Sequence, residues 1–351
     1  ILSVFIISFF WKLIGPLSFP LIQLFSTFIT LNIFYNLAIC AKMNKLNSLF
    51  ISIFCITFTF LFDVIFNLID INFLQTIQNN LINFYYYRFP RPIITNLFLF
   101  SYLYICFKIF YNETYNYKNF IFLGIISGIT LHLFYFFFVI QNILLFLLIL
   151  NRFGLKRYLF SNQNIKIYLI YSFFLILFLF LYVLNLSFAD KDYLTRLSPI
   201  DINFEKRIIL LEYYYEFIIN KIFIILLTLN IITHLLNKYY FKLKIFEFLN
   251  IIFYTSIISP IIFFSLTPKV ITIYHFFNWI LIFGTLNLIF ICLYIFGKYL
   301  NLHIKKILQI TYIFLSIMIV NYKLISNNLV VDEQRKDQYE IANFLTSNEK
   351  N

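Results

Sequence analysis

The chain is poor in charge, glycine and sulfur: 12% of its 351 residues are Asp, Glu, Lys or Arg, and it has 6 Gly, 4 Cys and 2 Met. Soluble domains carry about 25% charged residues, so this deficit argues against a soluble globular protein. The sequence contains no P-loop, GxSxG, CxxC or HExxH motif and no nucleic-acid motif, which excludes the most familiar signatures of nucleotide, ester, dithiol and zinc chemistry. The four cysteines lie singly in apolar runs, so we expect small buried residues rather than disulfides or metal ligands.

The chain consists mostly of long apolar runs. Hydrophobic residues make up 62% of it, and the mean hydropathy is +0.87. Because a helix needs roughly 20 apolar residues to cross a bilayer core about 30 Å thick, we predict an all-α, polytopic transmembrane helical bundle over residues 1–325. It should have about ten or eleven membrane segments, including one short hairpin. The expected segments are an incomplete first helix ending near Trp11, then 21–41, 48–69, 93–111, 119–150, 167–187, 217–237, 248–266, 277–297 and 306–325.

Loop charges predict which side of the membrane each loop faces. The net charge of +12 comes largely from Lys and Arg in alternate loops, as expected for loops that face the cytoplasm. The basic loops are marked by Lys42 and Lys45, by Arg152, Lys156, Arg157 and Lys166, by Lys238, Lys242 and Lys244, and by Lys298, Lys305 and Lys306. The outer face then receives loops 70–92, 188–216 and 267–276 and a short amphipathic tail, 326–351. The chain opens inside an apolar run, so we expect that an N-terminal segment is missing.

This assignment requires that segment 119–150 cross the membrane an even number of times. We therefore predict a hairpin of two short helices with its turn near His132 on the outer side. Gly124 and Gly128 would permit close packing of the first arm. The alternative is one long tilted helix, which would place the basic loops outside.

Two outer loops are candidates for binding an anionic group. Arg88-Phe89-Pro90-Arg91-Pro92 directly precedes a predicted helix, and the N-terminus of a helix favours phosphate. Lys269 and His275 share loop 267–276, where they would bind phosphate and transfer a proton, and His132 would face the same cavity. The alternatives are arginines that extend to lipid head groups and histidines that pack against aromatic rings at the interface.

Acidic residues near the outer face are candidates for catalysis or metal binding. Asp63 and Asp70, seven residues apart at the end of the third helix, would serve as a general base or hold a divalent metal. Asp190 and Asp192 form a weaker candidate site for Mg²⁺ or Mn²⁺. The alternative for Asp63 and Asp70 is a helix-end aspartate bonded to water or a neighbour, and for Asp190 and Asp192 a solvated loop.

Together these features resemble the GT-C superfamily of polytopic glycosyltransferases. The resemblance lies in the Arg88–Pro92 loop, the short hairpin over Gly124–Phe138, Tyr274-His275-Phe276, and the tail with Arg335, Asp337, Glu340 and Phe344-Leu345. It implies transfer of a sugar from a polyprenyl-phosphate or polyprenyl-pyrophosphate donor to a glycan, lipid or protein acceptor on the non-cytoplasmic face. In that family a catalytic acid typically lies in the first outer loop, whereas residues 11–20 contain no acid.

The leading hypothesis is therefore a membrane glycosyltransferase of a bacterial inner membrane, or of the endoplasmic reticulum membrane in a eukaryote. Its catalytic candidates are Asp63, Asp70 and His275, and its donor-phosphate candidates are Arg88, Arg91, Lys269 and His132. Three alternatives stay open: an envelope polysaccharide polymerase or flippase, a secondary transporter, and a non-catalytic membrane protein.

Overall fold

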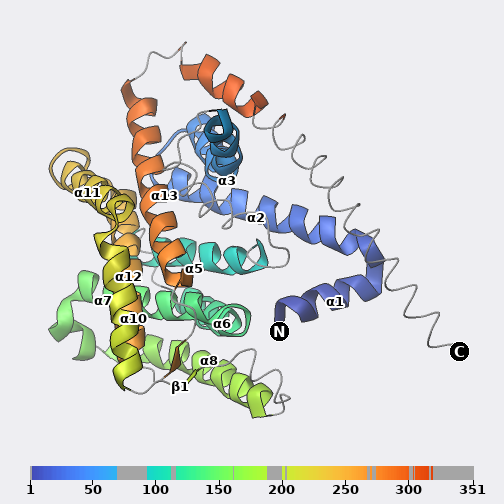
Figure 1. Ribbon diagram of the computed structural model, residues 1–351, viewed down its shortest axis with the longest axis vertical. Helices are drawn as coiled ribbons and strands as arrows, with labels where there is room; N and C mark the ends of the chain where they lie inside the picture. The colour runs from blue at the N-terminus through green and yellow to red at the C-terminus, as the bar shows by residue number, and fades with distance from the viewer. Residues whose placement is uncertain are drawn as a thin grey trace, which may run out of the picture.

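The computed structural model describes residues 2–68, 93–111, 116–160, 162–187, 200–201, 204–266, 269–270, 274–299, 303, 305–315 and 318. These residues form an all-α bundle, as predicted (Figure 1). Its helices are α1 (Leu2–Ile14), α2 (Ser18–Cys40), α3 (Lys45–Leu68), α5 (Ile93–Tyr111), α6 (Tyr117–Leu133), α7 (Tyr135–Phe160), α8 (Asn162–Ser187), α10 (Phe204–Ile219), α11 (Lys221–Leu236), α12 (Lys244–Leu266) and α13 (Tyr274–Tyr299). A 3₁₀ turn, η1 (Gly15–Leu17), joins α1 to α2, and a π-helical turn, η2 (Asn237–Phe241), extends α11.

Five helical segments within the described residues are long and apolar enough to cross a membrane. They are Ile94–Tyr111, Ile165–Leu184, Phe223–Phe241, Lys244–Phe263 and Trp279–Tyr299. Four shorter apolar helices accompany them: Leu24–Cys40, Lys45–Thr57, Tyr117–Leu133 and Tyr135–Asn151. The protein is therefore an integral membrane protein with several spans. The predicted tail, 326–351, lies outside the described residues.

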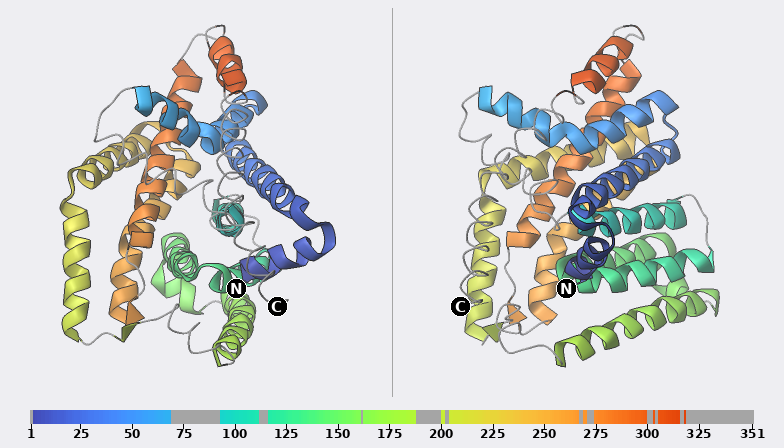
Figure 2. Two further views of the ribbon diagram at one scale, coloured as in Figure 1. Left: turned by 45° about the vertical axis from the view of Figure 1, so that its right-hand side comes forward. Right: turned by 90° about the vertical axis from the view of Figure 1, so that its right-hand side faces the viewer.

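The helices form two packed groups. In the first, α3, α2, α5, α6 and α8 follow one another as a row in which each helix packs on the next (Figure 2). In the second, α12 lies between α7 and α13, and α11 packs on α13. The groups meet mainly where α7 contacts α6 and α5, and also where α12 contacts α5 and α13 contacts α3. The row places α3 and α8 at opposite edges of the molecule, which limits which predicted site residues can meet.

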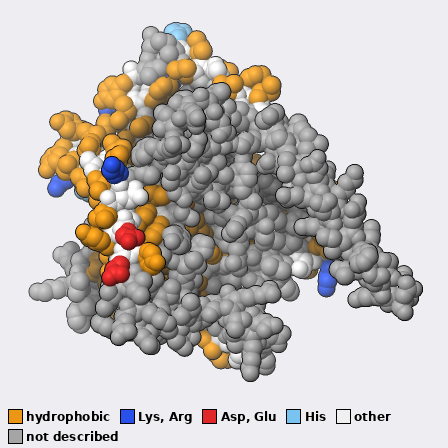
Figure 3. All heavy atoms as spheres, in the orientation of Figure 1, with side chains coloured by type: hydrophobic (Ala, Val, Ile, Leu, Met, Phe, Trp, Pro, Cys, Tyr) orange, Lys and Arg blue, Asp and Glu red, His pale blue; other side chains and the backbone are white. Residues whose placement is uncertain are grey.

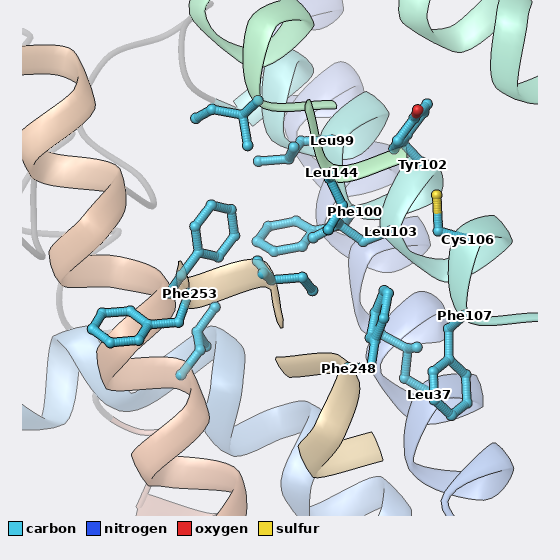
Figure 4. Packing of buried hydrophobic residues seen from close by; sticks show 14 of the residues in the cluster. Leu37, Leu99, Phe100, Tyr102, Leu103, Cys106, Phe107, Leu144, Phe248 and Phe253 are labelled. Carbon is cyan, nitrogen blue, oxygen red and sulfur yellow. The ribbon is translucent and has the colours of Figure 1, made fainter. Parts of the chain in front are cut away.

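Aromatic and aliphatic side chains fill the space between the groups. Phe100, Phe107 and Phe248 are almost fully buried where α5 meets α12, and Phe253 of α12 is buried beside α13 (Figure 4). Apolar side chains also cover the outside of the bundle: Leu169, Phe173 and Phe180 of α8 are about 60% exposed. Figure 3 shows the same apolar character on the described part of one face. An apolar exterior is the surface that lipid chains solvate.

The cysteines illustrate why burial was hard to predict. All four are free thiols, and Cys55 and Cys106 are buried, as expected. Cys292 is exposed, so that part of the prediction was wrong. A membrane helix is apolar both on its lipid-facing side and on its core-facing side, and hydropathy does not distinguish the two.

The structure confirms a hairpin in segment 119–150. Phe134 has extended backbone angles (φ −157°, ψ 97°) and separates α6 from α7. Across the break, Asn142 Nδ2 donates to Ser127 Oγ at 3.1 Å, and Gln141 Nε2 donates to Thr130 Oγ1 at 3.3 Å. These bonds require that the two helices fold back on each other, which rules out one long helix.

Two predicted boundaries were wrong. Helix α7 extends to Phe160, ten residues beyond the predicted end of segment 119–150. The expected outer loop 188–216 contains most of α10, and the expected span 217–237 is split at Asn220 between α10 and α11. Tyr214 and Phe217 hold α10 in place by stacking on Phe277 of α13, with ring centroids 6.1 and 4.1 Å apart. The abundance of charge in this region concealed the apolar face that makes these contacts. Figure 2 shows α10 at a steep angle to the row of helices.

The helix ends gather at two opposite ends of the bundle. We call one the Lys244 end, because Lys244 and Glu247 of α12 there contact Tyr111 of α5 and Asn151 of α7. The C-terminus of α13 belongs to it too: Lys298 lies over the Phe241 ring, and Lys305 Nζ donates to the carbonyl of Gly297 at 2.7 Å. Burial lowers the pKa of Lys305 from its ordinary value. The opposite end, which holds Phe134, α10 and the N-terminus of α13, is called the α10 end.

These two ends match the grouping of loops that the hairpin requires. Tyr111 and Asn151 precede loops that were both predicted to face the cytoplasm, and both reach the N-terminus of α12. Loops 188–216 and 267–276, both predicted to lie outside, meet in a pair of two-residue antiparallel strands, β1 (Ile200–Asp201) and β2 (Lys269–Val270). Which end faces the cytoplasm stays a prediction from the basic loops.

Candidate functional site at the α10 end

The structure describes some of the predicted site residues fully, some only by their backbone position and some not at all. Asp70, Arg88, Arg91, Asp190 and Asp192 lie outside the described residues. For Asp63, Lys269 and His275 the structure gives the backbone position, and for His132 it also gives the side chain.

The first turn of α5 lies beside the helix break. Ile94 forms a small apolar cluster with Leu133, the last residue of α6, and with Ile22 of α2. Ile93, where α5 begins, directly follows Arg91-Pro92 in the sequence. The helix that the two arginines precede therefore starts at the α10 end, next to the break.

The break also contacts the ends of α12 and α13. The Tyr135 ring meets Phe263 of α12 with centroids 5.5 Å apart, and Phe136 meets Phe276 of α13 at 4.9 Å. Phe263 and Phe276 in turn lie 5.6 Å apart. These rings form one aromatic cluster that fixes the start of α13, and with it the backbone of His275, beside the hairpin.

Lys269 and His275 lie on elements that flank the N-terminus of α13. Lys269 stands opposite Asp201 in the strand pair, and His275 is the second residue of α13. Unsatisfied amide groups and the helix dipole give a helix N-terminus a partial positive charge, so this position suits an anion. The predicted grouping of Lys269 with His275 at one end of the molecule agrees with this backbone arrangement.

His132 has a different environment from the one a phosphate ligand needs. Its Nε2 donates to the carbonyl of Phe178 in α8 at 3.0 Å, and its ring packs edge-on against Phe178 and Tyr182. This is the packing that the alternative interpretation of His132 describes. A phosphate-binding role for His132 stays a prediction.

Asp63 is placed apart from the other candidates. It lies in the last third of α3, at the edge of the helix row opposite α8 and β1 (Figures 1 and 2). His275 begins α13, near that opposite edge. The structure therefore brings Lys269, His275 and His132 to one side of the α10 end and does not bring Asp63 to them.

A buried polar network that the sequence analysis did not single out supports the break. The Tyr171 hydroxyl donates to Asn142 Oδ1 at 2.8 Å, and the Tyr102 hydroxyl donates to the backbone carbonyl of Gln141 at 3.0 Å. Together with the bonds from Asn142 and Gln141 to α6, these contacts tie α5, α6, α7 and α8 together. The sequence feature that could have indicated this network is Gln141-Asn142, two adjacent amide side chains inside an apolar run.

A second polar cluster joins α11, α12 and α13. Asn287 Nδ2 donates to Asn230 Oδ1 at 2.8 Å and to Asn250 Oδ1 at 2.7 Å, and all three residues are buried. Asn230 also donates to the carbonyl of Gly284 at 3.3 Å. These contacts hold the helices on which the α10 end is built.

One apolar cavity lies among the described core residues. The apolar cavity lined by Phe34, Phe100, Phe248 and Phe283, among others, has a volume of about 20 Å³. That is close to the room one water molecule needs and far below a prenyl chain. Among the described residues no three His, Cys, Asp or Glu side chains form a metal-binding group, and Asp190 and Asp192 are not among them.

Comparisons of the chain with protein-family models, with curated proteins and with solved structures give no match.

Proposed function

We propose that the protein is a membrane glycosyltransferase that transfers a sugar from a polyprenyl-phosphate or polyprenyl-pyrophosphate donor at the α10 end. The observation that carries the proposal is the meeting of four features at that end: the start of α5, the break at Phe134, strand β2 and the start of α13. Arg91 lies two residues before α5, Lys269 lies in β2 and His275 lies in the first turn of α13, and these side chains suit phosphate binding and proton transfer.

In this proposal the donor phosphate is bound by Arg88 and Arg91, which precede α5, and by Lys269 near the N-terminus of α13. Positive groups placed where the leaving phosphate gains charge stabilise the transition state more than the ground state. His275, in the first turn of α13, accepts the proton of the acceptor hydroxyl. A carboxylate completes the site; the predicted candidates are Asp63, which α3 holds at the opposite edge of the row, and Asp70, which lies outside the described residues.

The prenyl chain of the donor lies on the lipid-facing surface of the bundle in this proposal. The apolar cavity among the described core residues, at about 20 Å³, is too small to hold such a chain. A lipid donor also explains why the reaction would use a polytopic protein, because the chain never needs to leave the bilayer.

The test is a transfer assay with membranes that contain the Arg88→Ala, Arg91→Ala double variant. Radiolabelled sugar on a defined polyprenyl phosphate is the donor, and labelled product is measured after extraction. We expect the rate to fall by about a hundredfold or more, because removal of one charge-stabilising donor typically costs that much. Lys298→Ala, which removes an exposed cation at the Lys244 end, is the matched control and should keep its rate. Equal rates in the double variant and the wild type would overturn the proposal.

A further inference from the structure

A polar pocket lies at the Lys244 end, at the opposite end of the bundle from the candidate transferase site. It is formed by the C-terminus of α5, the N-terminus of α12 and residues Leu148 and Asn151 within α7, and it has a volume of about 210 Å³. Phe110, Tyr111 and Leu148 are buried and form its apolar floor, while Asn151, Lys244 and Glu247 supply its polar wall. The pocket is thus about ten times larger than the apolar cavity of the core, and it is polar where that cavity is not.

The pocket presents one positive and one negative group that do not pair with each other. Lys244 Nζ donates to the carbonyl of Tyr111 at 3.0 Å, and Glu247 Oε1 accepts from Asn151 Nδ2 at 3.2 Å. The two side chains are three residues apart on one helix, a spacing at which opposite charges usually meet. Among the described residues each is instead turned to a different helix, Lys244 to α5 and Glu247 to α7.

The neighbouring helices hold this separation in place. Tyr111 stacks on Phe107 with centroids 5.4 Å apart and meets Phe248 edge-on at 5.6 Å, which fixes the carbonyl that Lys244 contacts. An ammonium has three donors and a carboxylate about four acceptor positions, so each group keeps bonding capacity after its one hydrogen bond to another described residue. A ligand with charges of both signs would use that capacity on both sides.

We propose that this pocket binds a phosphoethanolamine-type zwitterion, with the phosphate on Lys244 and the primary ammonium on Glu247. Asn151 orients the carboxylate, and the rings of the floor contact the two methylene groups between the charges. The same group occurs free in solution and as the head group of an aminophospholipid, and the helix ends of a membrane protein can meet both. The proposal does not depend on the transferase function.

The test uses the purified full chain in a detergent without phosphate, with its thermal unfolding followed by Trp fluorescence. Phosphoethanolamine should raise the unfolding temperature in a saturable way, because a ligand that binds the folded state stabilises it. Phosphate alone and ethanolamine alone should each act much more weakly. Phosphocholine should bind at least about tenfold more weakly than phosphoethanolamine, since a quaternary ammonium cannot donate a hydrogen bond to Glu247.

A second experiment separates the free ligand from the lipid head group. Nanodiscs of phosphatidylethanolamine are compared with nanodiscs of phosphatidylcholine, with and without free phosphoethanolamine.

Glu247→Gln keeps the size of the side chain and removes its charge, and it should weaken binding of phosphoethanolamine about tenfold or more. Lys244→Ala should do the same; if that variant does not fold, Glu247→Gln decides the matter alone. Lys238→Ala, which removes an exposed cation at the same end, is the control and should bind as the wild type does. A saturable shift that Glu247→Gln leaves unchanged, equal shifts with phosphocholine, or no shift with free or lipid-borne ligand would each overturn the proposal.

Discussion

One buried asparagine from each of α11, α12 and α13 joins these three membrane helices. Asn287 bridges Asn230 and Asn250 in a region where other side chains are apolar, and neither water nor lipid can replace its bonds. Asn250 Nδ2 and Asn287 Oδ1 are buried without a hydrogen-bond partner among the described residues, so the cluster is only partly satisfied. Its net contribution to stability is therefore expected to be modest, as for other polar contacts between membrane helices.

Replacement of Asn287 by Leu tests this contribution. The substitution leaves Asn230 Oδ1 and Asn250 Oδ1 buried without their donor, so the free energy of unfolding should fall by about 1–2 kcal/mol. The measurement is unfolding in mixed detergent micelles, followed by fluorescence. Thr228→Val is the control, because Thr228 is exposed on α11 and bonds to its own helix, at the carbonyl of Ile224. Stability equal to or above that of the wild type would show that the cluster does not hold the helices together.

At the scale of elements, the close approach of α6 and α8 depends on two glycines. A Cβ built at Gly124 would lie 3.0 Å from Phe174 Cβ, and one at Gly128 would lie 2.6 Å from Phe178 Cβ. Phe178 is also the residue whose carbonyl accepts from His132. The spacing of these glycines predicted close packing of the first hairpin arm correctly, and the structure adds that the partner is α8.

We predict that Gly128→Ala separates α6 from α8. The added methyl group overlaps Phe178, and overpacking of this kind typically costs about 1–3 kcal/mol. The bond between His132 and Phe178 should weaken at the same time, which the imidazole resonances of His132 would report in an NMR spectrum of selectively labelled protein. Gly297→Ala is the matched control, since the nearest atom to its Cβ, Asn47 Nδ2, lies at 3.4 Å. Equal unfolding temperatures for the two variants would contradict this account of the contact.

Some elements of the fold could be predicted from the sequence, and others could not. Run lengths located most of the apolar helices within a few residues, although α7 extends ten residues beyond its predicted end at 150. The alternation of basic loops required the hairpin that Phe134 creates. Helix α10 was missed because its contacts, from Tyr214 and Phe217 to Phe277, are tertiary and its surroundings are highly charged. The bonds from Tyr102, Tyr171 and Asn287 were missed for the same reason, since they join residues far apart in the chain. Asp63 was named as a catalytic candidate together with His275 because the sequence indicates how deep a residue lies in the membrane but not at which edge of the bundle it lies.

At the scale of the whole molecule, the helix ends are sorted into two chemically different ends. The Lys244 end gathers exposed cations such as Lys238, Lys242 and Lys298, whereas α10 carries the exposed acids Glu212 and Glu216. This sorting is the arrangement that the predicted orientation requires, with the Lys244 end in the cytoplasm and the α10 end outside. Both proposed sites depend on it, one at each end.

The most direct test of this arrangement is cysteine labelling at the two ends of α6. In a variant without the four native cysteines, Phe134→Cys marks the α10 end and Asn116→Cys, the N-cap of the helix, marks the Lys244 end. A membrane-impermeant maleimide is added to intact cells and then to permeabilised cells. The account predicts that Cys at 134 reacts in intact cells and that Cys at 116 reacts only after permeabilisation. Reaction of both from the same side, or of 116 alone in intact cells, would contradict it.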